Sequence, residues 1–188
     1  MRIDFSFYIP KMKDKISVLQ ETVGTGEAKY KNGMSYEDAK KKLLGLLDDN
    51  NQTILKSKDG EEARLSRTSI GKLISNDAVR KSMNNGFTRE QHYAAASDIS
   101  DLFENSIKVW EHPDEHGNSD VVAMHRFAAP LFGDNAAYIT VKEATEHGKR
   151  IYTVELIETG KLEGMLEEAK LNFTNLPASS LPIHKYSK

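Results

Sequence analysis

Two strongly polar side chains, His125 and Arg126, stand in the middle of a segment that otherwise resembles a buried strand, VVAMHRFAAP at residues 121–130. An imidazole can exchange a proton near neutral pH, and a guanidinium can hold a phosphate through two parallel hydrogen bonds. Either these side chains are solvated on the open face of a strand, or they belong to a site. Because strand side chains alternate between faces, one of the two must face the open side and the other must find a partner.

The next two extended segments predict a polar strip beside that strand. In AYITVKE, at residues 137–143, alternation places Thr140 and Lys142 on the face opposite the apolar side chains. In RIYTVELIE, at residues 150–158, it leaves Thr153 and Glu155 outward. It also predicts an apolar inner set in the second segment, which consists of Tyr152, Val154 and Leu156. The plain interpretation of the strip is a solvated sheet face, and the functional one is a site.

A third candidate is His92, which follows a helix start. Thr88 is a suitable N-cap and Gln91 is its capping-box partner, so His92 lies in the first turn. A protonated imidazole there would oppose the helix dipole, so the position favours the neutral form that a general base needs. The other cluster of polar residues, HPDEH at residues 112–116, lies on one turn and is a weak metal pattern. We expect neither a metal nor any other cofactor.

The elements that must position these residues predict an α+β fold, with helices packed on one face of a four-stranded antiparallel sheet. Four extended segments follow one another at short spacing, separated by glycine-containing turns. Helix signals and a hairpin signature at Asp59-Gly60 precede them. The predicted helices are residues 35–49, 68–83, 85–109 and 161–170, the hairpin is 53–66, and the strands are 106–112, 120–130, 136–144 and 150–158, the first of which overlaps the end of the third helix.

The same pattern predicts a division of the chain into three parts. Residues 1–67 form a mixed α/β accessory segment, residues 68–174 form the main α+β domain, and residues 175–188 form a tail.

Composition limits the classes of function. The 188-residue chain has no cysteine, which excludes thiolate zinc sites, disulfides and a cysteine nucleophile. Its net charge of −2 gives no global attraction to nucleic acid or membrane, so any RNA contact depends on a local patch, and no run of interleaved aromatic and basic residues is evident. No apolar run is long enough to cross a membrane, and the first residues lack the features of a secretory signal. We therefore expect a cytoplasmic protein with no membrane partner.

Five short motifs occur in a fixed order between residues 68 and 158. They are NG-x-T-x-x-x-H ending at His92, D-L-F-x-N from Asp101, HPD from His112, HRF from His125 and ITVKE from Ile139. This combination resembles a domain of the large polyvalent proteins of phages and conjugative elements, a domain that looks related to the barnase–EndoU–colicin–RelE class of nuclease folds.

The resemblance implies a helix followed by a four-stranded antiparallel sheet and metal-independent cleavage of RNA at the 2′-hydroxyl. Such cleavage needs a base, an acid and a cation for the charge on phosphorus. The resemblance makes His92, His125 and Lys142 the catalytic candidates, and Arg126, Thr140 and Thr153 the substrate-binding ones. RNA is the implied partner, and an inhibitor (immunity) protein is expected if the chain acts as a toxin.

Two other functions use the same residues. The domain could be a non-catalytic module of a mobile element that binds nucleic acid or protein through the polar strip. It could also be a structural or interaction protein whose strip is only solvated. Salt dependence separates these functions, because phosphate contacts weaken steeply as salt rises.

Overall fold

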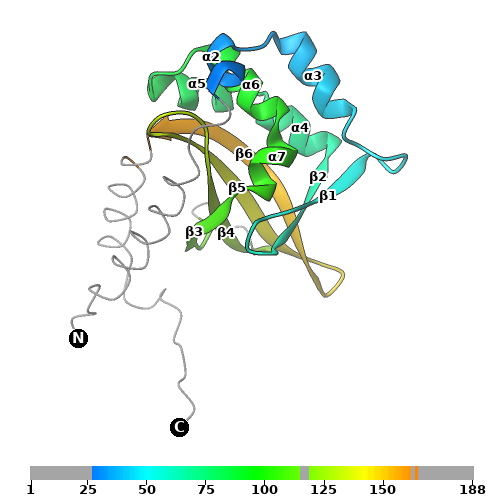
Figure 1. The fold of residues 1–188 in the computed structure, drawn as a ribbon. Helices are drawn as coiled ribbons and strands as arrows, with labels where there is room; N and C mark the ends of the chain where they lie inside the picture. The colour runs from blue at the N-terminus through cyan, green and yellow to red at the C-terminus, as the bar shows by residue number, and fades with distance from the viewer. Residues whose placement is uncertain (1–26, 115–118, 162–163, 165–188) are drawn as a thin grey trace, which may run out of the picture.

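The computed structural model describes residues 27–114, 119–161 and 164, and shows a helical layer on one face of a sheet (Figure 1). The class is therefore α+β, as the sequence predicts. The helices are α2 (Glu27–Asn32), α3 (Tyr36–Leu44), α4 (Arg67–Leu73), α5 (Asn76–Asn84), α6 (Arg89–Ser97) and α7 (Ile99–Glu104). The strands are β1 (Gln52–Lys56), β2 (Glu62–Ser66), β3 (Ile107–His112), β4 (Val121–Pro130), β5 (Asn135–Glu146) and β6 (Lys149–Lys161).

The sheet has six strands in the order β1-β2-β6-β5-β4-β3, and it is mixed. Strands β3 to β6 form the expected antiparallel meander, but β2 runs parallel to β6 and brings β1 with it through their hairpin. The expectation of a four-stranded antiparallel sheet is therefore wrong. The expectation fails because Arg64 of β2 pairs with Thr153 of β6. These two residues are so far apart in the chain that neither local alternation nor turn residues could predict the pairing.

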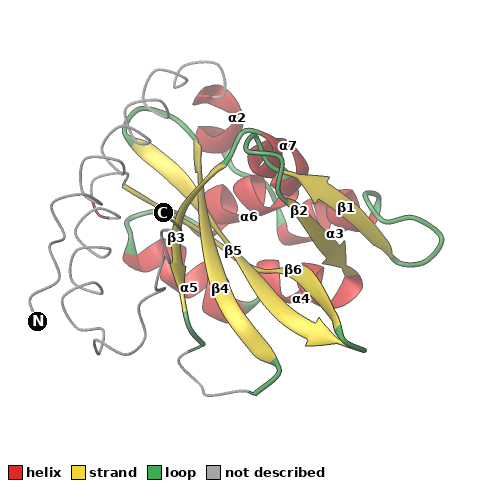
Figure 2. Ribbon diagram, turned by 90° about the horizontal axis from the view of Figure 1, so that it is seen from below, coloured by secondary structure: helices red, strands yellow, loops and turns green. Residues whose placement is uncertain are grey.

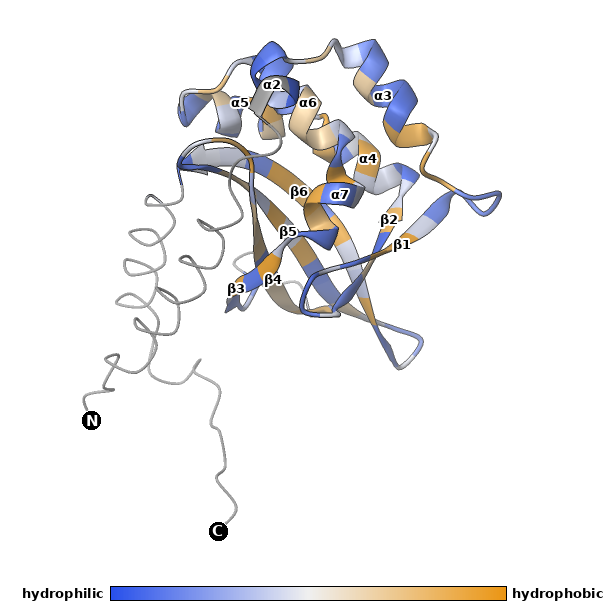
Figure 3. Ribbon diagram, viewed as in Figure 1, coloured by the Kyte–Doolittle hydropathy of each residue, from blue (hydrophilic) through white to orange (hydrophobic). Residues whose placement is uncertain are grey.

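The core lies between the sheet and its helices, which start at well-defined caps. Ser35, Ser66, Ser75 and Thr88 each accept a hydrogen bond from the backbone of the helix that follows, and Thr88 forms the predicted capping box with Gln91. Figure 3 shows hydrophilic residues on the outer sides of the helices. The largest fully buried apolar side chains are Phe103, Phe127, Leu43, Leu65, Leu73, Ile99, Ile139 and Ile157.

A buried carboxylate marks the point where the predicted long helix from residue 85 divides into α6 and α7. Asp98 is 2% exposed and forms ion pairs with Lys29 and Lys42, while the Tyr30 hydroxyl donates to it at 3.1 Å. Burial by itself would raise the pKa of Asp98, but the two lysines outweigh burial and lower it. Asp98 thus attaches α2 and α3 to the junction of α6 and α7.

A β-bulge in β6 changes which side chains share a face. Thr140 pairs with Leu156, but the next residue of β5, Val141, pairs with Val154, so Glu155 is the extra residue. The prediction that Leu156 belongs with Val154 is therefore wrong, because a bulge reverses the alternation of the residues beyond it. We call the side of the sheet that packs on the helices the helix face and the opposite side, which Figure 2 presents, the far face.

The β1–β2 hairpin reaches across to the start of β3. The amide of Lys58 donates to the carbonyl of Ser106 at 3.1 Å, and the Asp59 carboxylate accepts from the amide of Lys108 at 3.1 Å. Within the described ranges, no helix is long and apolar enough to cross a membrane. The helix predicted at residues 161–170 and the tail at 175–188 lie outside the described residues, apart from Lys161 and Gly164, and the predicted division into domains stays a prediction.

Candidate active site

Three neighbouring strands bring a guanidinium, a hydroxyl and a carboxylate together on the far face of the sheet. Arg126 of β4 donates to the Thr140 hydroxyl of β5 at 2.8 Å and to a Glu158 carboxylate oxygen of β6 at 3.1 Å. Arg126 is opposite Thr140 in the strand register, and Tyr138 is opposite Glu158. Glu158 is 7% exposed, and the charge-assisted hydrogen bond from Arg126 holds its carboxylate in a fixed place.

Helix α5 supplies the second cation and closes the outer edge of β6. Lys81 places its ammonium 3.8 Å from the other carboxylate oxygen of Glu158. Next to Glu158, the amide of Thr159 donates to the Ser82 hydroxyl at 3.0 Å, and its carbonyl accepts from the Asn85 side chain at 2.9 Å. Ser82 of α5 and Asn85, the residue that follows this helix, therefore satisfy the backbone of Thr159 as a further strand would, and they fix Glu158 against Lys81.

A pocket of about 410 Å³ opens at this point, within the range of small-ligand sites. Its lining includes Glu158 and Arg126 from the sheet and the exposed cations Lys81 and Lys161. The remaining described lining residues are Asn84, Asn85, Tyr138, Gly160 and Gly164. A phosphate in the pocket would therefore meet several cations beside one carboxylate, which is a suitable set for acid-base chemistry on a phosphodiester.

The predicted catalytic residue His92 lies elsewhere, in the interior of the helical layer. It is 0% exposed, its Nε2 donates to the Leu73 carbonyl at 2.9 Å, and its Nδ1 lies 2.8 Å from the Ser82 hydroxyl. Because a carbonyl can only accept, Nε2 carries the proton and a neutral Nδ1 accepts from Ser82. Burial lowers the pKa of His92, although the Leu73 carbonyl and the charge of Glu158 act the other way. The sequence predicted a neutral imidazole at His92, and in the structure this ring is one member of a chain of buried hydrogen bonds.

The predicted catalytic residue His125 lies on the helix face, opposite to its neighbour Arg126. Its Nε2 lies 2.8 Å from the Glu143 carboxylate and its Nδ1 lies 3.3 Å from that of Glu111. Burial alone would raise the pKa of Glu143, but its hydrogen bonds from His125 and Arg150 lower it. The opening ambiguity of the HRF motif is thereby resolved: Arg126 faces the far side, and His125 finds its partners on the helix side.

Lys142 and Thr153 lie side by side on the far face, one row from Thr140. They are opposite each other in the register of β5 and β6, and the Lys142 ammonium lies 3.2 Å from the Glu155 carboxylate. The structure therefore brings Arg126 and Thr140 into contact and places Lys142 and Thr153 beyond them. It does not bring His92, His125 and Lys142 together, and their catalytic roles stay predictions.

Sequence reasoning missed Glu158, Lys81 and Tyr138. Alternation counted from Val154 without the bulge assigns Glu158 to the inner face, and Lys81 lies on a helix far away in the chain. The signal that could have found Glu158 is its charge at an apparently inward strand position, because a buried carboxylate requires a cationic partner. In the part of the chain that the structure describes, no group of three or more histidine and carboxylate side chains could hold a metal ion.

Comparison with known proteins identifies one family. The family model described as large polyvalent protein-associated domain 3 matches residues 34–152, more than half of the chain. No curated protein and no solved structure matches the chain significantly. The matched range includes Arg126, Thr140 and Lys81, and it ends before Glu158.

Replacing His92 with glutamine should lower the free energy of unfolding by about 1–3 kcal/mol at pH 8, because the buried Ser82 hydroxyl loses its acceptor. This deficit should shrink as the pH falls. The pKa of His92 is lowered in the folded protein, so below the ordinary value of 6.5 the unfolded wild type takes up a proton that the folded one does not, and the wild type loses stability. Urea unfolding at several pH values measures both effects.

The matched control for this measurement is His112→Gln, a histidine on β3 outside the buried chain. A His92→Gln deficit that stays constant from pH 8 to pH 5, or that narrows equally in His112→Gln, would contradict the assigned role.

Replacing Gly160 with alanine should disturb the pocket wall and destabilise the fold by about 1–3 kcal/mol. The added Cβ would lie 2.8 Å from the Tyr138 ring and 3.2 Å from the Asn85 amide nitrogen, so the ring must move. Gly71→Ala is the control, since a Cβ at Gly71 meets open space and a helix gains up to about 1 kcal/mol from the change. Equal stability of Gly160→Ala and wild type in urea unfolding would show that the contact does not constrain Tyr138.

Proposed function

This chain belongs to the large polyvalent protein-associated domain 3 family, and we propose that it is a metal-independent endoribonuclease of a mobile element that acts at the pocket beside Glu158. The observation that carries this proposal is a buried carboxylate held 3.1 Å from Arg126 at the wall of a pocket that two exposed lysines also line. The proposal keeps the reaction expected from the sequence and changes the residues that perform it.

The reaction requires three groups, and the pocket contains a candidate for each. Glu158 accepts the proton of the RNA 2′-hydroxyl as its oxygen attacks the adjacent phosphorus. Arg126, whose position is fixed by Thr140, stabilises the charge that develops on the phosphoryl oxygens. The bond to the 5′-oxygen then breaks, and this oxygen takes a proton from the ammonium of Lys81 or Lys161. The products are a 2′,3′-cyclic phosphate and a 5′-hydroxyl, and no water is consumed in this step.

Nearby groups support this division of roles. Lys81 is about half exposed and lies 3.8 Å from Glu158, so it can approach both the substrate and the base. The exposed Lys161 is held at 2.5 Å by the Asp134 carboxylate at the same end of the sheet. A neutral 2′-hydroxyl and an anionic phosphate thus meet the groups that suit them, a carboxylate and three cations.

The experiment is cleavage of a 5′-labelled single-stranded RNA by the purified protein in excess EDTA, with analysis of the product ends. Glu158→Gln, which keeps the shape of the side chain, should slow cleavage by about 10²–10⁴-fold. Arg126→Lys should slow it by about 10²-fold or more, because the charge stays but the fork of donors is lost. The same oligonucleotide with 2′-O-methyl groups should not be cleaved at all.

Glu104→Gln is the matched control, since it makes the same chemical change at an exposed position of α7 and should retain wild-type activity. His125→Gln and Lys142→Ala, run beside it, test the residues that the sequence predicted. Cleavage that depends on His125 and not on Glu158 would contradict the proposed site. RNA binding by the wild type without any cleavage would contradict the enzyme and favour a nucleic-acid-binding module.

A further inference from the structure

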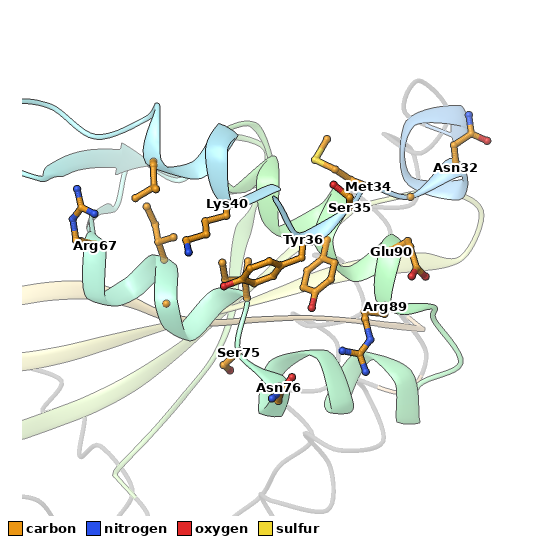
Figure 4. A pocket seen from close by; sticks show the side chains of 16 residues that line it. Asn32, Met34, Ser35, Tyr36, Lys40, Arg67, Ser75, Asn76, Arg89 and Glu90 are labelled. Atoms are coloured by element: carbon orange, nitrogen blue, oxygen red, sulfur yellow. The ribbon is translucent and has the colours of Figure 1, made fainter. Parts of the chain in front are cut away.

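A second, larger cavity lies in the helical layer, and the proposed reaction does not use it. Its volume is about 1030 Å³, at the upper end of the range for ligand sites, and it runs between α3, α4 and the start of α6 (Figure 4). The described residues that line it are all different from those that line the Glu158 pocket. We call it the helix-layer groove.

The charged residues of this groove are mainly cations. Arg67 begins α4, Lys40 comes from α3 and Arg89 begins α6, while Glu90 is the one carboxylate in the described lining. Arg67 is held in place because its Nε and Nη2 both donate to the Asn51 side chain, at 3.2 and 2.9 Å. Figure 4 shows Arg67 and Arg89 toward opposite ends of the groove, so an anion could be held at each end.

Two tyrosine rings, Tyr36 and Tyr93, also line the groove. Tyr36 is 39% exposed, and its ring centroid is 5.6 Å from that of Tyr93 in an edge-to-face arrangement. The Lys40 ammonium lies 5.6 Å from the centre of the Tyr36 ring. An exposed ring flanked by cations is the combination that binds single-stranded nucleic acid, since bases stack on rings and phosphates meet cations.

The wall formed by α4 is open where the groove is lined by Gly71. A Cβ at this position would meet nothing within 4 Å, so neither packing nor backbone conformation requires a glycine there. A glycine inside a helix costs about 1 kcal/mol relative to alanine. Its effect is to leave the backbone of α4 accessible from the groove and to keep the space beside it free.

From the cations, the exposed ring and the open wall together, we propose that the helix-layer groove binds a short segment of single-stranded RNA, with a base stacked on Tyr36 and phosphates at Arg67 and Arg89. This inference does not depend on cleavage at Glu158. If both proposals hold, the groove is a docking site that retains RNA away from the reacting phosphate.

The test is fluorescence anisotropy of a labelled 2′-O-methyl hexanucleotide, which cannot be cleaved, titrated with the full chain at several salt concentrations. Tyr36→Ala should weaken binding about tenfold. Arg67→Ala should weaken it and also lower the slope of log affinity against log salt by about 0.7, the value for one phosphate contact on a single strand. Gly71→Phe should block the groove and abolish binding, although its Cβ has room and the helix can form.

Lys56→Ala is the charge-matched control for Arg67→Ala, because Lys56 is an exposed cation on β1, outside the groove. Thermal unfolding of every variant separates loss of the site from loss of the fold. Wild-type protein that does not bind the oligonucleotide, or stably folded groove variants that bind it like Lys56→Ala, would overturn the proposal. Binding that depends on Arg67 but not on Tyr36, and that polyglutamate displaces equally well, would show a general anion site and overturn the assignment to RNA.

Failure here can be distinguished from failure of the proposed function. The oligonucleotide assay measures binding without chemistry and changes residues outside the Glu158 pocket, whereas the cleavage assay reports the pocket itself. A protein that binds through the groove but does not cleave would retain this inference and lose the nuclease.

Discussion

A chain of buried hydrogen bonds from Leu73 through His92 and Ser82 to Thr159 determines how the helices meet the sheet. Each donor in it has one acceptor: the ring Nε2 donates to the carbonyl, the Ser82 hydroxyl donates to Nδ1, and the Thr159 amide donates to the Ser82 oxygen. The chain links α4, α6, α5 and β6 in fully buried surroundings, where an unmade hydrogen bond is costly. Its last member is adjacent to Glu158, so the position of the carboxylate depends on it.

Buried carboxylates balanced by cations recur in this small protein, and their surroundings separate their roles. Asp98 is enclosed by two lysines and a tyrosine and joins helices, and Glu143 joins His125 to Arg150 at the hairpin end of the sheet. Glu158 is paired in the same way but also lines a pocket. A buried ion pair is by itself weak support for function, because such pairs also serve structure. Access to the pocket is what distinguishes Glu158 as the candidate base.

The two proposals together describe a protein that holds a long, flexible anion at two cavities. The Glu158 pocket is lined by a carboxylate and cations, and the helix-layer groove is lined by an exposed tyrosine ring and cations. The net charge of −2 does not reveal either cavity, because cations outnumber carboxylates in the described lining of each one. Overall charge therefore says little about what this domain can bind.

The sequence by itself determined the α+β class, the capping box of Thr88 and Gln91 and the meander from β3 to β6, because periodicity, capping and turn chemistry act over a few residues. It could not determine that β2 joins β6, that a bulge turns Glu158 toward Arg126, or that Tyr36, Arg67 and Arg89 line one groove. The ring nitrogens of His92 and His125 could serve either as catalysts or as structural partners, and local sequence does not distinguish the two. Tertiary packing decided the strand pairing, the bulge and the groove, and it gave both histidines buried hydrogen-bond partners, since each of these depends on contacts between residues far apart in the chain.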